Sequence, residues 1–222
     1  RLHGDAGDDV LYGDAGVDYL YGDEGDDLAF GGEGNDKLDG YNGDDRLYGG
    51  AGNDKLTGFA GDDRLDGERG ADTMNGVGGS DTFVVDNSGD TVLERANEGT
   101  DTVETSISFV LPEHCERLSL TGTADINGWG NAASNTILGN EGDNIITGLR
   151  GADVLVGREG ADTFRYVSLV DSRQADGIDR IADFNFAGGD RVDVSAIDAN
   201  SVLAGNQAFA TLIAAGVAFT QA

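Results

Sequence analysis

Aspartate recurs at every ninth position through the first part of the chain. The series comprises Asp9, Asp18, Asp27, Asp36, Asp45, Asp54, Asp63, Asp72 and Asp81. If the fold stacks these carboxylates, they need a shared cation, because two carboxylates a few ångströms apart repel by about 1–4 kcal/mol. Six or more flexible oxygen ligands favour Ca²⁺ over the smaller Mg²⁺. The spacing therefore predicts a series of calcium sites.

Glycine and apolar residues recur in phase with the aspartates. If Gly4 is the first position of a nine-residue unit, glycine fills the first and fourth positions nine times, and an apolar residue fills the eighth. The fourth-position glycines are Gly7, Gly16, Gly25, Gly34, Gly43, Gly52, Gly61, Gly70 and Gly79. Two glycines in six residues predict a tight turn, since glycine adopts positive φ without steric cost. Carbonyls freed in these turns are further candidate calcium ligands.

The three residues between turns, such as Val10-Leu11-Tyr12, suit a short strand with its middle side chain pointing inward. One unit cannot bury its leucine alone, but stacked units bury a continuous ladder, as in a solenoid. Two units would make one coil of eighteen residues, so aspartates eighteen apart would stack. This arrangement gives four stacked pairs on one edge and three on the other, hence about seven calcium ions on the oxygen-ligand reasoning above.

This unit resembles the RTX (repeat-in-toxin) nonapeptide repeat of exported bacterial proteins, whose pattern is Gly-Gly-x-Gly-x-Asp-x-apolar-x. The resemblance implies an all-β fold, a parallel β-roll or right-handed β-solenoid. The second glycine of the pattern appears only as Gly32 and Gly50; the other residues are Asp5, Asp14, Asp23, Tyr41, Phe59, Glu68 and Val77. In the family this position supplies a carbonyl, so these departures affect turn geometry more than metal binding. A disordered acidic tract is the alternative, but disorder does not require an apolar residue at every ninth position.

A second, shorter series of units begins at Gly130. Its fourth positions are Ala133, Gly142, Gly151 and Gly160, and its sixth positions are Asn135, Asn144, Asp153 and Asp162. Pairing at eighteen residues joins Asn135 to Asp153 and Asn144 to Asp162. Because asparagine offers one neutral oxygen, we expect one or two weaker calcium sites here. An asparagine-stacked solenoid without metal is the alternative.

The chain therefore divides into residues 1–84 (the first roll), 85–128 (the insert), 129–166 (the second block) and 167–222. In the insert, stretches rich in β-branched residues at 91–94, 102–104, 107–111 and 117–120 predict strands that continue the solenoid with longer coils. Alternation of apolar and polar residues at 178–184 and 189–200 predicts a closing β cap, which an open-ended solenoid needs. This last part resembles the C-terminal region of serralysin-type secreted proteases, which implies a signal for type I secretion.

Aromatic side chains also recur at eighteen residues. Tyr41, Phe59 and Val77 would form a column on one edge of the roll, and we expect this column to pack against residues 85–222. Cross-strand stacking that only stabilises the sheet is the alternative.

Composition excludes several classes of function. The chain has 42 acidic and 14 basic residues, a net charge of −28, which argues against nucleic acid and anionic membrane surfaces as partners. No apolar run approaches the ~20 residues of a membrane-spanning helix. His3, His114 and Cys115 are too scattered to indicate zinc. We find no catalytic motif, so the chain itself is not expected to be an enzyme.

We therefore expect a calcium-dependent folding and type I secretion module of a larger exported bacterial protein, since Leu2 already occupies the eighth position of a preceding unit. Its expected partners are calcium, the ABC transporter of type I secretion and upstream domains of the same polypeptide. Its expected location is extracellular, with the cell surface as an option. One alternative is the C-terminal part of a metalloprotease, lipase or polysaccharide-modifying enzyme. Another is the spacer of an RTX adhesin or surface-layer protein.

Overall fold

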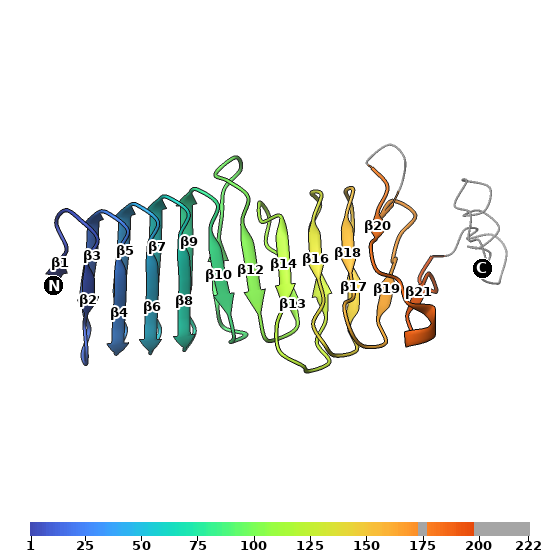
Figure 1. Ribbon diagram of the computed structural model, residues 1–222, viewed down its shortest axis with the longest axis horizontal. Coiled ribbons are helices and arrows are strands. Elements are labelled where there is room, and N and C mark those ends of the chain that lie inside the picture. Colours follow the sequence, from blue (N-terminus) through green and yellow to red (C-terminus); the bar gives the residue numbers. More distant parts are fainter. Residues whose placement is uncertain (173–176, 198–222) are drawn as a thin grey trace.

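The computed structural model describes residues 1–172 and 177–197, which form a rod of stacked β-coils with the N-terminus at one end (Figure 1). Three parallel sheets run along the rod. The first contains β1 (Leu2–His3), β3 (Tyr19–Glu24), β5 (Lys37–Asn42), β7 (Lys55–Ala60), β9 (Thr73–Gly78) and β11 (Thr91–Leu93). The second contains β2 (Val10–Tyr12), β4 (Leu28–Glu33), β6 (Arg46–Ala51), β8 (Arg64–Arg69), β10 (Thr82–Val85), β12 (Thr102–Thr105), β14 (Arg117–Leu120), β16 (Thr136–Leu138), β18 (Val154–Val156) and β20 (Arg180–Ile181). The third contains β13 (Phe109–Val110), β15 (Gly128–Trp129), β17 (Ile145–Thr147), β19 (Thr163–Arg165) and β21 (Arg191–Asp193).

Within the first roll each strand pairs with the strand one coil away. The register joins Leu20 to Leu38 and Leu38 to Leu56, a step of eighteen residues. Two nine-residue units therefore make one coil, and the predicted all-β parallel solenoid is confirmed.

The strands of the first roll are longer than the three residues expected. Each of β3 to β9 spans six residues, because the ladder continues past the first glycine into the turn, where Asp23 pairs with Tyr41. The second-position residue adopts positive φ even where it is bulky, with 82° at Tyr41, 84° at Phe59 and 80° at Val77. Since such a backbone is uncommon for bulky residues, these turns store strain of about 1–3 kcal/mol each.

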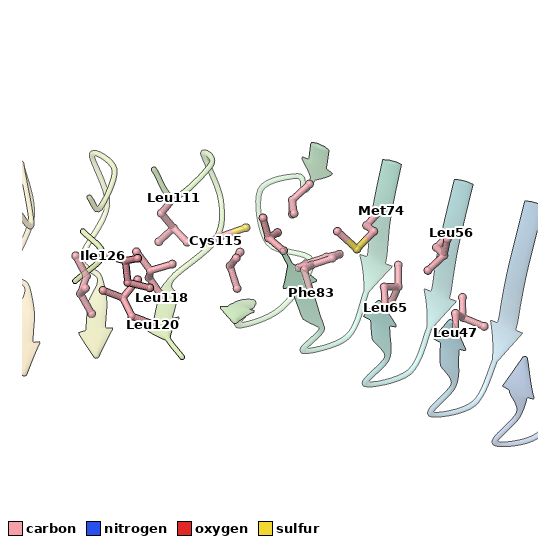
Figure 2. Close-up of a cluster of buried hydrophobic side chains, with 14 of the residues drawn as sticks. Leu47, Leu56, Leu65, Met74, Phe83, Leu111, Cys115, Leu118, Leu120 and Ile126 are labelled. Carbon is pink, nitrogen blue, oxygen red and sulfur yellow. The ribbon is translucent and has the colours of Figure 1, made fainter. Parts of the chain in front are cut away.

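The apolar eighth positions of both repeat blocks join the inward apolar residues of the insert in one continuous core from Leu11 to Phe164. Figure 2 shows this row of inward side chains, from Leu47 through Phe83 to Ile126. Leu20, Leu38 and Phe83 are completely buried. Stacking of coils thus buries what a single unit cannot, as the pattern predicts.

The insert continues the solenoid, but its coils vary in length. The register steps from Thr82 to Thr102, then to Arg117 and then to Thr136. The first and last of these steps are longer than eighteen residues, as expected, whereas the middle step is shorter. The expectation of uniformly longer coils is therefore wrong for the coil between β12 and β14.

At the C-terminal end, β20 and β21 each add a last strand to one of two sheets, with a short 3₁₀ helix (η1) at Phe186–Gly188 between them. These strands are shorter than the predicted stretches 178–184 and 189–200, and residues 198–200 lie outside the described residues. Among the described residues, no helix is long and apolar enough to span a membrane.

In the part of the chain that the structure describes, no second layer covers the aromatic column. The rings of Tyr41 and Phe59 stack in parallel with centroids 4.8 Å apart, and Phe59 pairs with Val77 in the next coil. The insert and the second block prolong the rod beyond the end of the first roll (Figure 1), so they do not cover this edge. For the described part of residues 85–222, the contact expected along this column is therefore wrong, and the column instead stacks across strands.

Candidate calcium sites

The sixth-position aspartates form two buried rows along the edges of the first roll. In each row the Oδ1 atom of one aspartate accepts a hydrogen bond from the backbone N–H of the aspartate one coil earlier. The distance is 2.8 Å from the Asp27 nitrogen to Asp45 and 2.8 Å from the Asp45 nitrogen to Asp63. The other row repeats this at 2.7 Å from Asp36 to Asp54. The structure thus brings together the aspartates that the eighteen-residue spacing pairs.

The second oxygen of these carboxylates has no partner. This group of buried, unpaired Oδ2 atoms comprises those of Asp27, Asp36, Asp45, Asp54, Asp63, Asp72 and Asp81. A buried carboxylate oxygen without a hydrogen bond is costly, and such groups in proteins are paired or coordinate metals. The donor set therefore fits a divalent cation in each gap between coils.

Both glycines of the unit are required by this close packing. A Cβ atom on Gly40 would collide with Oδ2 of Asp45, and a Cβ atom on Gly34 would collide with the carbonyl oxygen of Gly16. Among the described residues, no turn hydrogen bond ends on a fourth-position glycine carbonyl. These carbonyls remain free to serve as the expected backbone ligands, and the fourth-position glycines thus stay candidate ligand residues.

The electrostatics of the rows also favour a cation between the carboxylates. Burial, aided by repulsion from neighbouring aspartates and opposed by a hydrogen bond from a backbone N–H, raises the pKa of Asp45 to about 7 and that of Asp63 to about 8. Burial likewise raises the pKa of Asp72 and Asp81 to about 6. Without a cation, part of each row would have to hold protons near neutral pH.

Two further aspartates, which the repeat pattern did not assign, extend the rows into the insert. Asp90 accepts a hydrogen bond from the Asp72 nitrogen at 3.1 Å, and Asp101 accepts one from the Asp81 nitrogen at 2.9 Å. Asp90 keeps the nine-residue phase, although Val85 and Ser88 replace the first- and fourth-position glycines of its unit. Asp101 ends the fragment Gly99-Thr100-Asp101, which repeats the fourth to sixth positions of the unit.

In the second block the predicted pairs are also formed. The backbone nitrogen of Asn135 donates to Asp153 at 2.8 Å, and that of Asn144 donates to Asp162 at 2.9 Å. The rows then continue to two aspartates that the sequence pattern did not assign. Oδ1 of Asp179 accepts a hydrogen bond from the Asp153 nitrogen at 3.0 Å, and Oδ1 of Asp190 accepts one from the Asp162 nitrogen at 3.0 Å. Oδ2 atoms of Asp153, Asp162 and Asp179 are buried and unpaired. Candidate metal positions in this block therefore lie on the C-terminal side of the asparagines.

On their N-terminal side, the amide groups of Asn135 and Asn144 find hydrogen-bond partners within the protein. The Nδ2 atom of Asn144 donates to the carbonyl of Ile126 at 2.7 Å and to Oδ1 of Asn140 at 2.8 Å. Asn135 and Asn131 repeat the pattern, with Nδ2 of Asn135 3.1 Å from Oδ1 of Asn131. An amide group here supplies donors where a carboxylate would need a cation, which favours the metal-free alternative for this side of the coil.

A separate acidic row lies on the surface of the first roll at the fifth position. Asp26 accepts a hydrogen bond from the Asp44 nitrogen at 2.8 Å, and Asp44 accepts one from the Asp62 nitrogen at 2.8 Å. These side chains are exposed. Each accepts its hydrogen bond from the following coil, whereas the buried aspartates accept theirs from the preceding coil. They stabilise the turns without forming enclosed sites.

Comparison with known proteins agrees with this geometry. A family model described as the RTX calcium-binding nonapeptide repeat (HemolysinCabind) matches the chain in four copies, at residues 1–29, 21–56, 57–92 and 129–164. The matched residues include both repeat blocks and most of the aspartates with unpaired Oδ2 atoms. A search of curated proteins found no match.

Proposed function

Because the chain belongs to the RTX calcium-binding nonapeptide repeat family, we propose that it is a calcium-dependent folding, stabilisation and secretion module of a larger exported bacterial protein. The observation that carries the proposal is the set of buried, unpaired Oδ2 atoms in the first roll. A repeat β-roll of this family is a structural, calcium-binding fold and not a catalytic one, so any activity would belong to other parts of the parent protein.

Calcium would supply enough free energy to decide between the folded and unfolded chain. Extracellular calcium modules bind with a Kd of about 10⁻⁴–10⁻³ M. If free calcium is tenfold above Kd, each ion adds about 1.4 kcal/mol by mass action, and about seven ions add about 10 kcal/mol. This is comparable to the whole stability of an ordinary domain, about 5–15 kcal/mol. We propose about seven ions in the first roll and one or two in the second block.

The same balance supports a role in export. At low intracellular calcium the buried carboxylates repel one another, and the chain would remain unfolded. An unfolded chain suits passage through the narrow channel of a type I ABC transporter, and folding would follow outside the cell. Its partners would be calcium, the transporter and upstream domains of the same polypeptide.

Circular dichroism tests the proposal. We expect the β signal of the chain at pH 7.5 to be lost in excess chelator and restored by millimolar Ca²⁺, with millimolar Mg²⁺ as the control that does not restore it. Mg²⁺ should fail because it requires a smaller, regular octahedron and keeps its waters. A β spectrum unchanged by the chelator would refute the proposal.

A further inference from the structure

The coil that follows the first roll departs from the repeat at several positions, among them position 94. β11 pairs with β9 in the register Leu93 to Asn75, so Glu94 follows at the place that a first-position glycine occupies in the roll. Oε1 of Glu94 accepts a hydrogen bond from the backbone N–H of Gly76 at 3.2 Å. A long acidic side chain thus enters a position that glycine fills in every unit of the first roll.

Glu94 meets two buried aspartates there. One carboxylate oxygen each from Asp81, Glu94 and Asp101 lie within 4.8 Å of one another. Asp81 and Asp101 are each 1% exposed, and the Oδ2 atoms of both lack a hydrogen-bond partner. Oε2 of the nearby Glu98 is also buried and unpaired. The cluster therefore has unpartnered oxygen atoms in a buried position, which is what a cation site needs.

No side chain of the described residues neutralises the three carboxylates. Arg95, the adjacent basic residue, is 77% exposed and pairs with Glu98 at 3.9 Å instead. The candidate ligand atoms are all oxygens. The three carboxylates together carry a charge of −3 when ionised, whereas a stacked aspartate pair of the roll carries −2. Affinity for calcium rises with the number of charged ligands and with the rigidity of the site.

We propose that Asp81, Glu94 and Asp101 form a three-carboxylate calcium site that joins the insert to the first roll and binds more tightly than the repeat sites. The inference rests on the proposed function, because it takes calcium as the cation of the roll. It goes beyond the repeat pattern, because Glu94 and Asp101 come from the insert. The ion in this site fixes the first irregular coil onto the last regular one.

The test is Glu94→Gln in the full chain, with Glu113→Gln as the matched control. Glu113 lies in the same insert and is exposed, so its change removes the same charge without touching the cluster. The amide oxygen introduced by Glu94→Gln can keep the hydrogen bond from Gly76. In native mass spectrometry at limiting Ca²⁺ we expect Glu94→Gln to retain one ion fewer than wild type and the control. In a calcium titration its tightest binding step should weaken about tenfold.

A second variant separates ligation from general charge. Glu94→Asp keeps the charge but shortens the side chain by one methylene, so the tight step should weaken here too; wild-type affinity in this variant would overturn the site. If Glu94→Gln binds like Glu113→Gln while the wild type still folds with calcium, the junction site is wrong and the proposed function stands. If the wild type takes up no calcium, both are wrong.

Discussion

The two oxygens of each buried aspartate have different roles. In Asp45, Oδ1 accepts the backbone N–H of Asp27 at 2.8 Å, whereas Oδ2 is buried and unpaired. Oδ1 thus holds the coils in register with or without metal, and Oδ2 makes the folded state depend on a cation. Asparagine at the same position would keep the first role and lose the second.

Asp45→Asn should therefore lower the stability of the fold in the presence of calcium and raise it in its absence. With calcium about tenfold above Kd we expect a loss of about 2 kcal/mol, about 1 kcal/mol per ion, since the ions on both sides lose a carboxylate and each binds about tenfold more weakly. In chelator the variant should retain more β ellipticity than wild type, because a buried charge has been removed. Urea denaturation in calcium and circular dichroism in chelator measure the two effects.

Asp44→Asn is the matched control for this change. Asp44 is exposed, and asparagine would keep its bond from the Asp62 nitrogen. We expect its effect to stay within about 0.5 kcal/mol in calcium, as for most surface changes. Equal losses in Asp44→Asn and Asp45→Asn would contradict the assignment of the buried rows as the ligands.

At the scale of the element, the turn is the part of the unit that tolerates least change. In an interior turn, the fourth-position glycine lies directly against the carbonyl of the equivalent glycine one coil earlier, as Gly34 does against Gly16. The strand beside it carries only one obligatory side chain, the inward apolar residue. Turn geometry, more than strand composition, therefore sets the distance at which aspartates of neighbouring coils meet.

Gly34→Ala and Gly7→Ala separate backbone strain from collision. Both glycines have positive φ, 149° and 112°, so alanine costs about 1–3 kcal/mol of backbone strain at either site. A Cβ atom on Gly34 would strike the Gly16 carbonyl, whereas one on Gly7, in the terminal coil, would meet no described atom within 4 Å. We expect Gly34→Ala to raise the calcium midpoint for folding severalfold more than Gly7→Ala does. Calcium titrations followed by circular dichroism measure this, and equal midpoints would refute the collision.

The elements also show where sequence reasoning succeeds and where it fails. The aspartate rows of the first roll follow from periodicity alone, because every coil there has the same length. Asp101, Asp179 and Asp190 escape that reasoning because the coils before them have other lengths, which irregular loops determine and no period encodes. The hydrogen bonds that the side-chain amides of Asn140 and Asn144 donate were missed for another reason. The repeat pattern treats asparagine as a weak calcium ligand and ignores its two N–H donors.

At the scale of the whole molecule, many buried carboxyls act together. Burial raises the pKa of Asp63 to about 8 and those of Asp45 and Asp153 to about 7, against about 3.9 in an unfolded chain. Between about pH 4, the unfolded pKa, and about pH 8, the highest of these folded pKa values, the folded chain binds more protons than the unfolded chain. Its calcium-free stability is therefore highest below about pH 4 and is lost as the pH rises to about 8.

The chain dialysed free of calcium should accordingly gain β ellipticity as the pH is lowered from 8 to 5. In calcium the trend should reverse, because protons compete with the ion for the same oxygens and the calcium midpoint should rise on acidification. A pH titration of the circular dichroism signal with and without calcium measures both slopes. A flat calcium-free signal over this range would contradict the pKa shifts of the rows.

The eighteen-residue register has a consequence for how such a chain can change in length. Asp36-Lys37 and Asp54-Lys55 are equivalent points of successive coils, so loss of residues 37–54 would rejoin the chain with Lys55 in the place of Lys37. Every column of side chains would survive, shorter by one member. Loss of nine residues would instead exchange the two faces and divide the Tyr12–Phe30–Tyr48 stack between them. Duplication or deletion of DNA in steps of 54 base pairs, three per residue, therefore lets this fold grow or shrink without a new core or new ligands.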